Sequence, residues 1–187
     1  PAKIGGRSLP ADQLYMDNMT PVSQFVNHML EQGITRIGFV GQFDHCQSFY
    51  ERYTAYYLSM VMAGHAVEDK FIIRYNEIDN LRGMIEDLDE LPEVFVCAND
   101  FVAWDTMQAL AAAGKRVPED VLICGFDDSV ESRFSKPPLT TVHIHTQITA
   151  YSAVHLLLTR IKEPSLDYRI VHTETELIYR ESTEKVR

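Results

Sequence analysis

Short, continuously apolar segments alternate with longer amphipathic segments, and this alternation restricts the fold of the 187-residue chain more than any other feature. An apolar run of roughly four to eight residues is typical of a strand buried on both faces, as in a parallel sheet covered by helices. Parallel strands also need a long connection between them, which is usually a helix. The sequence therefore predicts an α/β fold with doubly wound parallel sheets. The expected strands are 36–40, 71–75, 94–97 and 121–126, with further strand character at 169–179.

Helical periodicity fills the intervals between these strands. Thr20 and Pro21 are typical of an N-cap followed by the first helical residue, and Gly33 is typical of a helix end. Further helices are expected at 47–63, 78–88, 100–113 and 148–161.

Polar residues directly after each strand mark the expected ligand site. In parallel α/β sheets, ligands bind beyond the carboxyl ends of the strands. Polar groups at the edge of an apolar scaffold favour a site for a small polar ligand. The segments concerned are Gly41-Gln42-Phe43, Tyr75-Asn76, Ala98-Asn99-Asp100 and Asp127-Asp128.

The charge balance argues against nucleic-acid binding by this segment itself. With 17 Lys and Arg against 27 Asp and Glu, the formal net charge is −10, and the basic residues form no cluster. A surface of this sign repels phosphate. No run of 18 apolar residues is present and residues 1–10 lack the apolar core of a secretory signal, so neither a membrane span nor a leader is expected in this sequence.

Cysteine usage favours a reducing cytoplasm. The chain has three cysteines, an odd number, and no CxxC pair. Cys97 and Cys124 each end an apolar run, which predicts buried strand residues.

No motif for catalysis, a cofactor or a metal is present. The G-x-G-x-x-G, P-loop and G-x-S-x-G patterns are absent, so we expect neither an enzyme nor a bound cofactor. His143 and His145 lack further metal ligands, and Asp127-Asp128 lack the lysine and second acidic cluster of a phosphotransfer pocket. Carboxylates that accept hydrogen bonds from sugar hydroxyls are the favoured interpretation of the two aspartates.

Ordered motifs along most of the chain resemble the lactose/galactose repressor (LacI/GalR) family. The combination of the AND, VPEDV…GFDD and PLTTV elements in this order is highly specific. The matching segments are YMDN (15–18), HMLEQGITRIGFVG (28–41), ERYTAYYLSM (51–60), VCANDFVAWDTMQAL (96–110), GKRVPEDVLICGFDDS (114–129), PPLTTV (137–142) and ELIYREST (176–183).

The resemblance implies a two-lobed, periplasmic-binding-protein-like fold with the N-terminal lobe truncated. Residues 1–5 correspond to the fourth strand of that lobe, so its earlier strands, a hinge helix and a helix-turn-helix head are expected to lie outside this chain. The implied divisions are 1–32 for the remnant of the N-terminal lobe, 33–140 for the C-terminal lobe, 141–170 for a crossover and an N-terminal-lobe helix, and 171–187 for the C-terminal strand and tail.

The resemblance also implies a ligand site. Arg52 matches the arginine that clamps the ligand, although the helical pattern alone favours a solvent-facing side chain there. Asp127 matches its carboxylate partner across the cleft, Asn99 the amide that contacts ligand hydroxyls, and Asp17 the acidic residue of the first crossover.

Two further candidates and two departures complete the predicted site. Ser48 lies one turn before Arg52, and Tyr75 stands where an aromatic platform is expected. Ile144 replaces a glutamine that is frequent near the ligand, and Ala55 replaces a glycine that is usual three residues after the arginine.

The implied function is the effector-binding part of a DNA-binding transcriptional repressor. The expected effector is a sugar or sugar phosphate that closes the lobes of a cytoplasmic homodimer, with DNA bound only through the helix-turn-helix head. Phe101, Trp104 and Phe134 are candidates for the dimer contact, although core packing remains open for Trp104. The alternative is an exported sugar receptor of the same fold, which a signal peptide upstream of Pro1 would distinguish.

Overall fold

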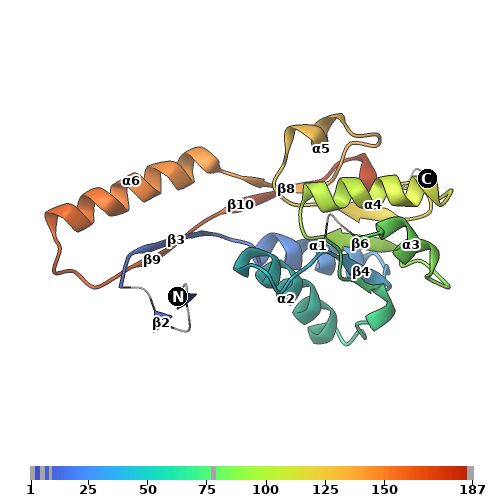
Figure 1. Cartoon of the computed structure of the whole chain (residues 1–187), viewed down its shortest axis with the longest axis horizontal. Helices are drawn as coiled ribbons and strands as arrows, with labels where there is room; N and C mark the ends of the chain where they lie inside the picture. The colour runs from blue at the N-terminus through green and yellow to red at the C-terminus, as the bar shows by residue number, and fades with distance from the viewer. Residues whose placement is uncertain (1–2, 5–6, 9, 77–78, 185–187) are drawn as a thin grey trace. The chain divides into compact units, whose positions relative to one another are not determined.

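The chain forms two compact units (Figure 1). The computed structural model describes residues 3–4, 7–8, 10–76 and 79–184. The smaller unit contains Pro1–Asp17 and Ile144–Thr175, and the larger unit contains Asn18–His143 and Glu176–Arg187. The first division thus lies at residue 17 rather than at the expected residue 32, because the helix between these positions packs within the larger unit.

The larger unit contains a four-stranded parallel sheet with the order β5-β4-β6-β7. Val40 at the end of β4 pairs with Ile73 and with Cys97, so the carboxyl ends of neighbouring strands meet at one edge. This arrangement confirms the predicted α/β class with a parallel sheet. The strands are β4 (Ile37–Val40), β5 (Ile72–Ile73), β6 (Val94–Cys97) and β7 (Leu122–Cys124).

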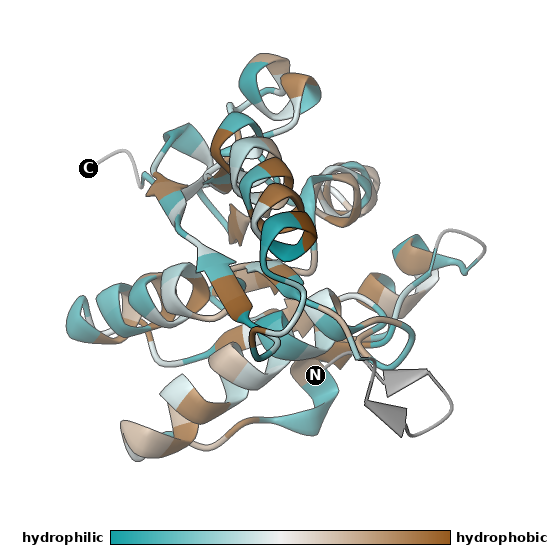
Figure 2. Ribbon diagram, turned by 90° about the vertical axis from the view of Figure 1, so that its left-hand side faces the viewer, coloured by the Kyte–Doolittle hydropathy of each residue, from teal (hydrophilic) through white to brown (hydrophobic). Residues whose placement is uncertain are grey.

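Helices cover both faces of this sheet. Phe39 packs against Tyr56 of α2, whereas its neighbour Val40 belongs to the cluster formed with α3 and α4. Successive strand residues point to opposite faces, so α2 lies on one face and α3 and α4 lie on the other. Figure 2 shows hydrophilic and hydrophobic residues interspersed along the helices, as expected for amphipathic elements. The helices are α1 (Thr20–Glu31), α2 (Gln47–Met62), α3 (Leu81–Glu86), α4 (Asp100–Ala112) and α5 (Val130–Phe134), with short 3-10 turns η1 (Asp69–Phe71) and η2 (Glu181–Thr183).

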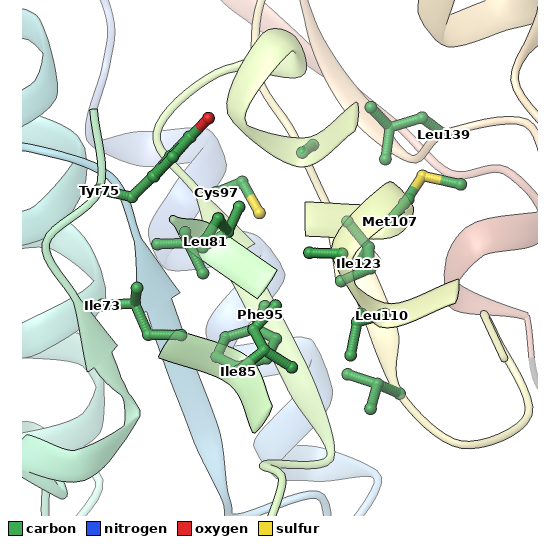
Figure 3. Close-up of a cluster of buried hydrophobic side chains, with 14 residues drawn as sticks. Ile73, Tyr75, Leu81, Ile85, Phe95, Cys97, Met107, Leu110, Ile123 and Leu139 are labelled. Atoms are coloured by element: carbon green, nitrogen blue, oxygen red, sulfur yellow. The ribbon is translucent and has the colours of Figure 1, made fainter. Parts of the chain in front are cut away.

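The core on the α3 and α4 side supports the edge of the sheet that carries the polar segments (Figure 3). Phe95, Leu110 and Ile123 are completely buried there. Tyr75, which follows β5, lies in the same cluster. Cys97 and Cys124 are buried thiols, as predicted, and burial raises the pKa of Cys97 to about 12. The residues that begin the polar segments are therefore attached to a packed interior.

The smaller unit is built on a parallel pair of strands, β3 (Gln13–Met16) and β9 (Ile170–Thr173). α6 (Thr146–Lys162) packs against β3. β1 (Lys3–Ile4) pairs with β2 (Arg7–Ser8) in an antiparallel arrangement. Pro1, Ala2 and Gly5 of the expected strand at 1–5 lie outside the described residues. Most apolar side chains of α6 are exposed, namely Ile148, Tyr151, Val154, Leu157, Leu158 and Ile161.

The end of the chain returns to the larger unit. β8 (Thr141–Ile144) and β10 (Thr175–Ile178) form a two-stranded sheet. The Ser182 hydroxyl then donates to the Ile123 carbonyl at 2.6 Å and accepts from the backbone N–H of Thr140 at 2.8 Å. A buried hydroxyl thus joins η2 to β7. Among the described residues, no helix has the length and hydropathy that a bilayer span requires.

Candidate functional site

Two glycines allow the chain segments at the carboxyl edge of the sheet to approach one another closely. Gly41 has φ of +139°, and a Cβ there would lie 2.5 Å from the Cβ of Ala98. A Cβ on Gly125 would collide with a carboxylate oxygen of Asp100. A side chain at either position would therefore separate segments that carry polar groups.

Arg52 connects three segments at this edge. It is only 3% exposed, although its own helix has exposed aromatic residues, so the solvent-facing interpretation of the helical pattern is wrong. Its Nε donates to Asn18 Oδ1 at 3.0 Å and its Nη1 to the Ala98 carbonyl at 2.7 Å. Its Nη2 donates to Asp127 Oδ1 at 3.3 Å, and its guanidinium carbon lies 3.6 Å from the centre of the Phe126 ring. Each nitrogen of the guanidinium thus has an acceptor.

The environment perturbs both members of the Arg52–Asp127 pair. Burial lowers the pKa of Arg52 below its ordinary value, against the opposing influence of Asp127. Burial also raises the pKa of Asp127 to about 6, even though Arg52 favours the charged form. Asp127 has φ of +113° and Asp128 has φ of +50°, a region that residues with side chains rarely adopt. Perturbed pKa values and backbone strain together are typical of functional sites.

Buried polar contacts hold the strained turn at Asp127 and Asp128 in place. Asp100 accepts from the Thr141 hydroxyl at 2.5 Å and from the Ser129 N–H at 2.7 Å, and burial raises its pKa. Asn99 is the N-cap of α4, where its Oδ1 accepts from the Val102 N–H at 2.9 Å. Its amide nitrogen donates to none of the described residues.

The carboxylate of Asp128 is buried among basic side chains. Its side chain is 2% exposed and accepts hydrogen bonds from Arg133, Arg180 and His143. Burial alone would raise its pKa, but the three hydrogen bonds outweigh burial and lower the pKa. Of the two adjacent aspartates, Asp127 is therefore the one that keeps a partly exposed carboxylate, and its role at the ligand stays a prediction.

A cavity of about 370 Å³ lies beside this network. Tyr75 and Asn99 both line it, so the structure brings two of the predicted residues together. Phe49 lines it as well, and its ring centre lies 5.4 Å from the Arg52 guanidinium carbon. The Tyr75 hydroxyl donates to Asp105 Oδ2 at 2.7 Å, which fixes both side chains in the cavity wall.

Of the remaining predicted residues, Phe101 belongs to the described cavity lining and the others do not. Ser48 is half-buried in the first turn of α2, with its hydroxyl 3.4 Å from the Cys46 sulfur. Asp17 belongs to the smaller unit, where its carbonyl accepts from the Thr175 hydroxyl, and its role at the ligand stays a prediction. Phe101, Trp104 and Phe134 are all exposed, and Phe101 also lines the cavity; the dimer stays a prediction.

Some residues of the site escaped the sequence analysis. Asn18 lies in a segment that matched the family, but its bond to Arg52 depends on α1 packing against α2. Phe49, His45 and Asp105 line the cavity from helical or loop positions that no strand-end rule selects. A partial signal exists for Phe49, which precedes Arg52 by three residues and therefore shares its helix face.

Among the residues that the structure describes, no group of three or more His, Cys, Asp or Glu side chains could hold a metal ion.

Comparison with known sequences shows a match to one family along most of the chain. Residues 26–183 match the periplasmic binding protein-like domain. The chain is 32% identical over 182 residues to the HTH-type transcriptional regulator GalR of Lacticaseibacillus casei, covering 92% of this chain and 55% of the relative. It is 31% identical over 164 residues to the HTH-type transcriptional repressor PurR of Aliivibrio salmonicida. This match covers 85% of this chain and 49% of the relative. It is 30% identical over 192 residues to the HTH-type transcriptional regulator CelR of Thermobifida fusca. This match covers 97% of this chain and 56% of the relative. The chain thus spans about half the length of these relatives.

Solved structures show the same fold. A CelR–cellobiose complex superposes with a TM-score of 0.84 at 24% identity, covering 96% of this chain and 56% of that one. A LacI family transcriptional regulator from Enterococcus faecium with bound ribose superposes with a TM-score of 0.80 at 20% identity. The superposition covers 97% of this chain and 69% of that one. The α/β architecture is therefore that of known transcriptional regulators.

Proposed function

The chain belongs to the LacI/GalR family of transcriptional regulators, as part of their periplasmic-binding-protein-like effector domain, and we propose that it binds a sugar that controls the attachment of a repressor dimer to DNA. The relatives are transcriptional regulators and not enzymes. Asp127 binds the effector, Arg52 holds that carboxylate in place, and Asn99, Ser48, Tyr75 and Asp17 are the further contacts.

The fixed Arg52–Asp127 pair is the observation that carries this proposal. Arg52 is held by Asn18 and Ala98, so its position does not depend on a ligand. Asp127 keeps about a third of its side chain exposed beside that arginine. A preorganised carboxylate supported from behind is suited to accept strong hydrogen bonds from hydroxyls, because little ordering is needed on binding.

Composition of the neighbouring cavity supports a sugar as the effector. Its wall combines the aromatic rings of Phe49 and Tyr75 with the amides of Asn76 and Asn99. Aromatic faces cover the CH side of a sugar ring, while amides bind its hydroxyls. Cellobiose and ribose are bound in two of the related regulators.

The proposed mechanism is a two-state switch. The effector stabilises one arrangement of the two lobes, and this arrangement sets the spacing of two DNA-binding heads in a homodimer. A chain of net charge −10 is poorly suited to contact DNA itself. We therefore propose that a helix-turn-helix head of the full-length protein contacts DNA and that the protein acts in the cytoplasm.

A ligand screen on the full-length product of the gene tests the proposal. We expect one of D-galactose, D-glucose, D-ribose or cellobiose to raise the melting temperature, since a ligand at about 100 times its Kd stabilises the folded state by about 2.7 kcal/mol. Arg52→Ala should abolish the shift. Arg82→Ala, which removes an exposed arginine paired with Glu86, is the matched control and should leave the shift unchanged.

Two results would contradict the proposal. One is a folded wild-type protein that no sugar stabilises. The other is a shift of normal size in Arg52→Ala, which would mean that the ligand binds at another site.

A further inference from the structure

The half-buried carboxylate of Asp105 lies in the cavity wall with one hydrogen-bond partner among the described residues. It belongs to α4, two turns beyond Asn99, and accepts from the Tyr75 hydroxyl through Oδ2 at 2.7 Å. Tyr75 is 6% exposed and packs in the core cluster, so its ring is held in place (Figure 3). A carboxylate can accept about four hydrogen bonds. Oδ1 of Asp105 is thus oriented and still able to accept from a ligand.

Among the described residues, the cavity lining has one carboxylate, Asp105, and one imidazole, His45. Asp105 is the acidic residue of its lining, and no lysine or arginine lines it among the described residues. The nearest guanidinium, Arg52, already donates to Asn18, to the Ala98 carbonyl and to Asp127. A phosphate group in the cavity would therefore face a carboxylate, with no lysine or arginine in the described lining to pair with it.

Given the sugar site proposed above, we infer that Asp105 is a specificity residue that selects a neutral sugar over its phosphorylated form. Asp105 accepts a hydrogen bond from a sugar hydroxyl and repels an anionic substituent. Tyr75 acts as a positioning residue, because its hydroxyl holds the carboxylate while its ring covers the apolar side of the ligand. Phe49 provides the second apolar wall beside His45, whose ring centre lies 4.8 Å from that of Phe49.

The alternative ligand class is a sugar phosphate. Such a ligand would need an Arg or Lys side chain or a helix N-terminus at the phosphate. α4 begins at the cavity, but the Asn99 side chain already caps its N-terminus by accepting from Val102, and Asp105 adds negative charge nearby. These observations favour the neutral ligand.

Titration calorimetry on the full-length gene product tests this inference. The probes are D-glucose with D-glucose 6-phosphate, and D-ribose with D-ribose 5-phosphate. In the wild type, the neutral member of the pair that binds should bind about tenfold or more tightly than its phosphate. Asp105→Asn should weaken the neutral sugar about tenfold to a hundredfold, as expected for the loss of a charge-assisted hydrogen bond, and should reduce the discrimination. Tyr75→Phe should produce a smaller loss of the same kind.

Controls separate this inference from the proposed function. Asp87→Asn makes the same charge change at an exposed residue that ends α3, and should leave both affinities unchanged. Circular dichroism and thermal unfolding check that each variant is folded. If Asp105→Asn binds as the wild type does while Arg52→Ala does not bind, the role of Asp105 is wrong and the function stands. Tighter binding of a phosphate by the wild type would also overturn the inference. If no sugar binds the wild type, both fail.

Discussion

Arg52 and Asp128 show how this protein buries charge. All three nitrogens of Arg52 have acceptors, and Asp128 accepts from two arginines and a histidine. Isolated buried charges are strongly unfavourable, but complete hydrogen bonding offsets the loss of hydration. These contacts join segments distant in sequence, so the same side chains that fix the site also fix the fold.

The hydrogen bonds that Asp128 accepts from Arg133, Arg180 and His143, together the Asp128 cluster, yield a prediction for stability. Arg180→Met should lower the free energy of unfolding by about 3 kcal/mol, because it removes a donor from a buried carboxylate and also the bond to the Leu139 carbonyl. Arg133→Met removes a more exposed partner of the same carboxylate and should cost much less. Urea unfolding of the two variants measures the difference. Equal losses would show that the cluster does not distinguish a buried from an exposed donor.

The raised pKa of Asp127 predicts how the free energy of unfolding depends on pH. Burial raises its pKa from 3.8 to about 6, so the folded state holds this proton more tightly than the unfolded state does. The free energy of unfolding should therefore fall as the pH rises between these two values, and the contribution of Asp127 should stay constant above them. Asp127→Asn removes the titration. The wild type should lose stability relative to this variant across the window, as measured by urea unfolding at a series of pH values; parallel curves would contradict the raised pKa.

At the residue scale, the contact between Arg52 and Asp127 could be predicted, whereas the directions of several single side chains could not. Arg52 and Asp127 were paired by family resemblance, since helical periodicity alone placed Arg52 in solvent. Asp127 and Asp128 are chemically identical neighbours, yet the side chain of Asp128 is 2% exposed and that of Asp127 is 34% exposed. Asp105 was missed because its placement depends on Tyr75 approaching from another strand end.

At the scale of elements, apolar runs were the most reliable indication of where strands lie. The strand at 94–97 has its predicted bounds, because pairing on both sides defines its length. The strand expected at 71–75 is confined to Ile72–Ile73, since it lies at the edge of the sheet and pairs on one side only. β3 and α5 were not predicted. The apolar run within Gln13–Met16 is only three residues long, and the five residues of α5 are too few to show a period.

The contact between α4 and the sheet also yields a prediction. Leu110 is completely buried in the cluster of Figure 3, so Leu110→Ala should lower the free energy of unfolding by about 2–5 kcal/mol. Leu58→Ala makes the same change on an exposed surface of α2 and should have an effect within about 0.5 kcal/mol. Guanidinium unfolding of both variants gives the comparison. Similar small losses would mean that the cluster is loosely packed.

At the scale of the whole molecule, the exposed aromatic side chains of α4 and α5 favour self-association. Phe101, Trp104 and Phe134 are all at least 42% exposed. Aromatic residues are enriched in protein interfaces, where they bury a large area at a small entropic cost. The proposed dimer assigns these side chains a partner.

Trp104→Ala tests the dimer. We expect it to weaken self-association at least tenfold, because an aromatic residue at the centre of an interface commonly contributes about 2 kcal/mol or more. Sedimentation equilibrium of the full-length gene product measures the dissociation constant. Tyr57→Ala removes a similarly exposed aromatic residue from α2 and serves as the control. Identical constants for the wild type and Trp104→Ala would place the interface elsewhere.

The return of the chain to the larger unit has a consequence for recombination between related genes. The unit that carries Arg52, Asp127 and the cavity is encoded by two separate stretches, 18–143 and 176–187. A single crossover in the intervening 144–175 would join one parent's β7 to another parent's η2, although Ser182 has to fit the Ile123 carbonyl and the Thr140 N–H. Functional chimaeras should therefore inherit both stretches from one parent, and selection among hybrids should favour double exchanges.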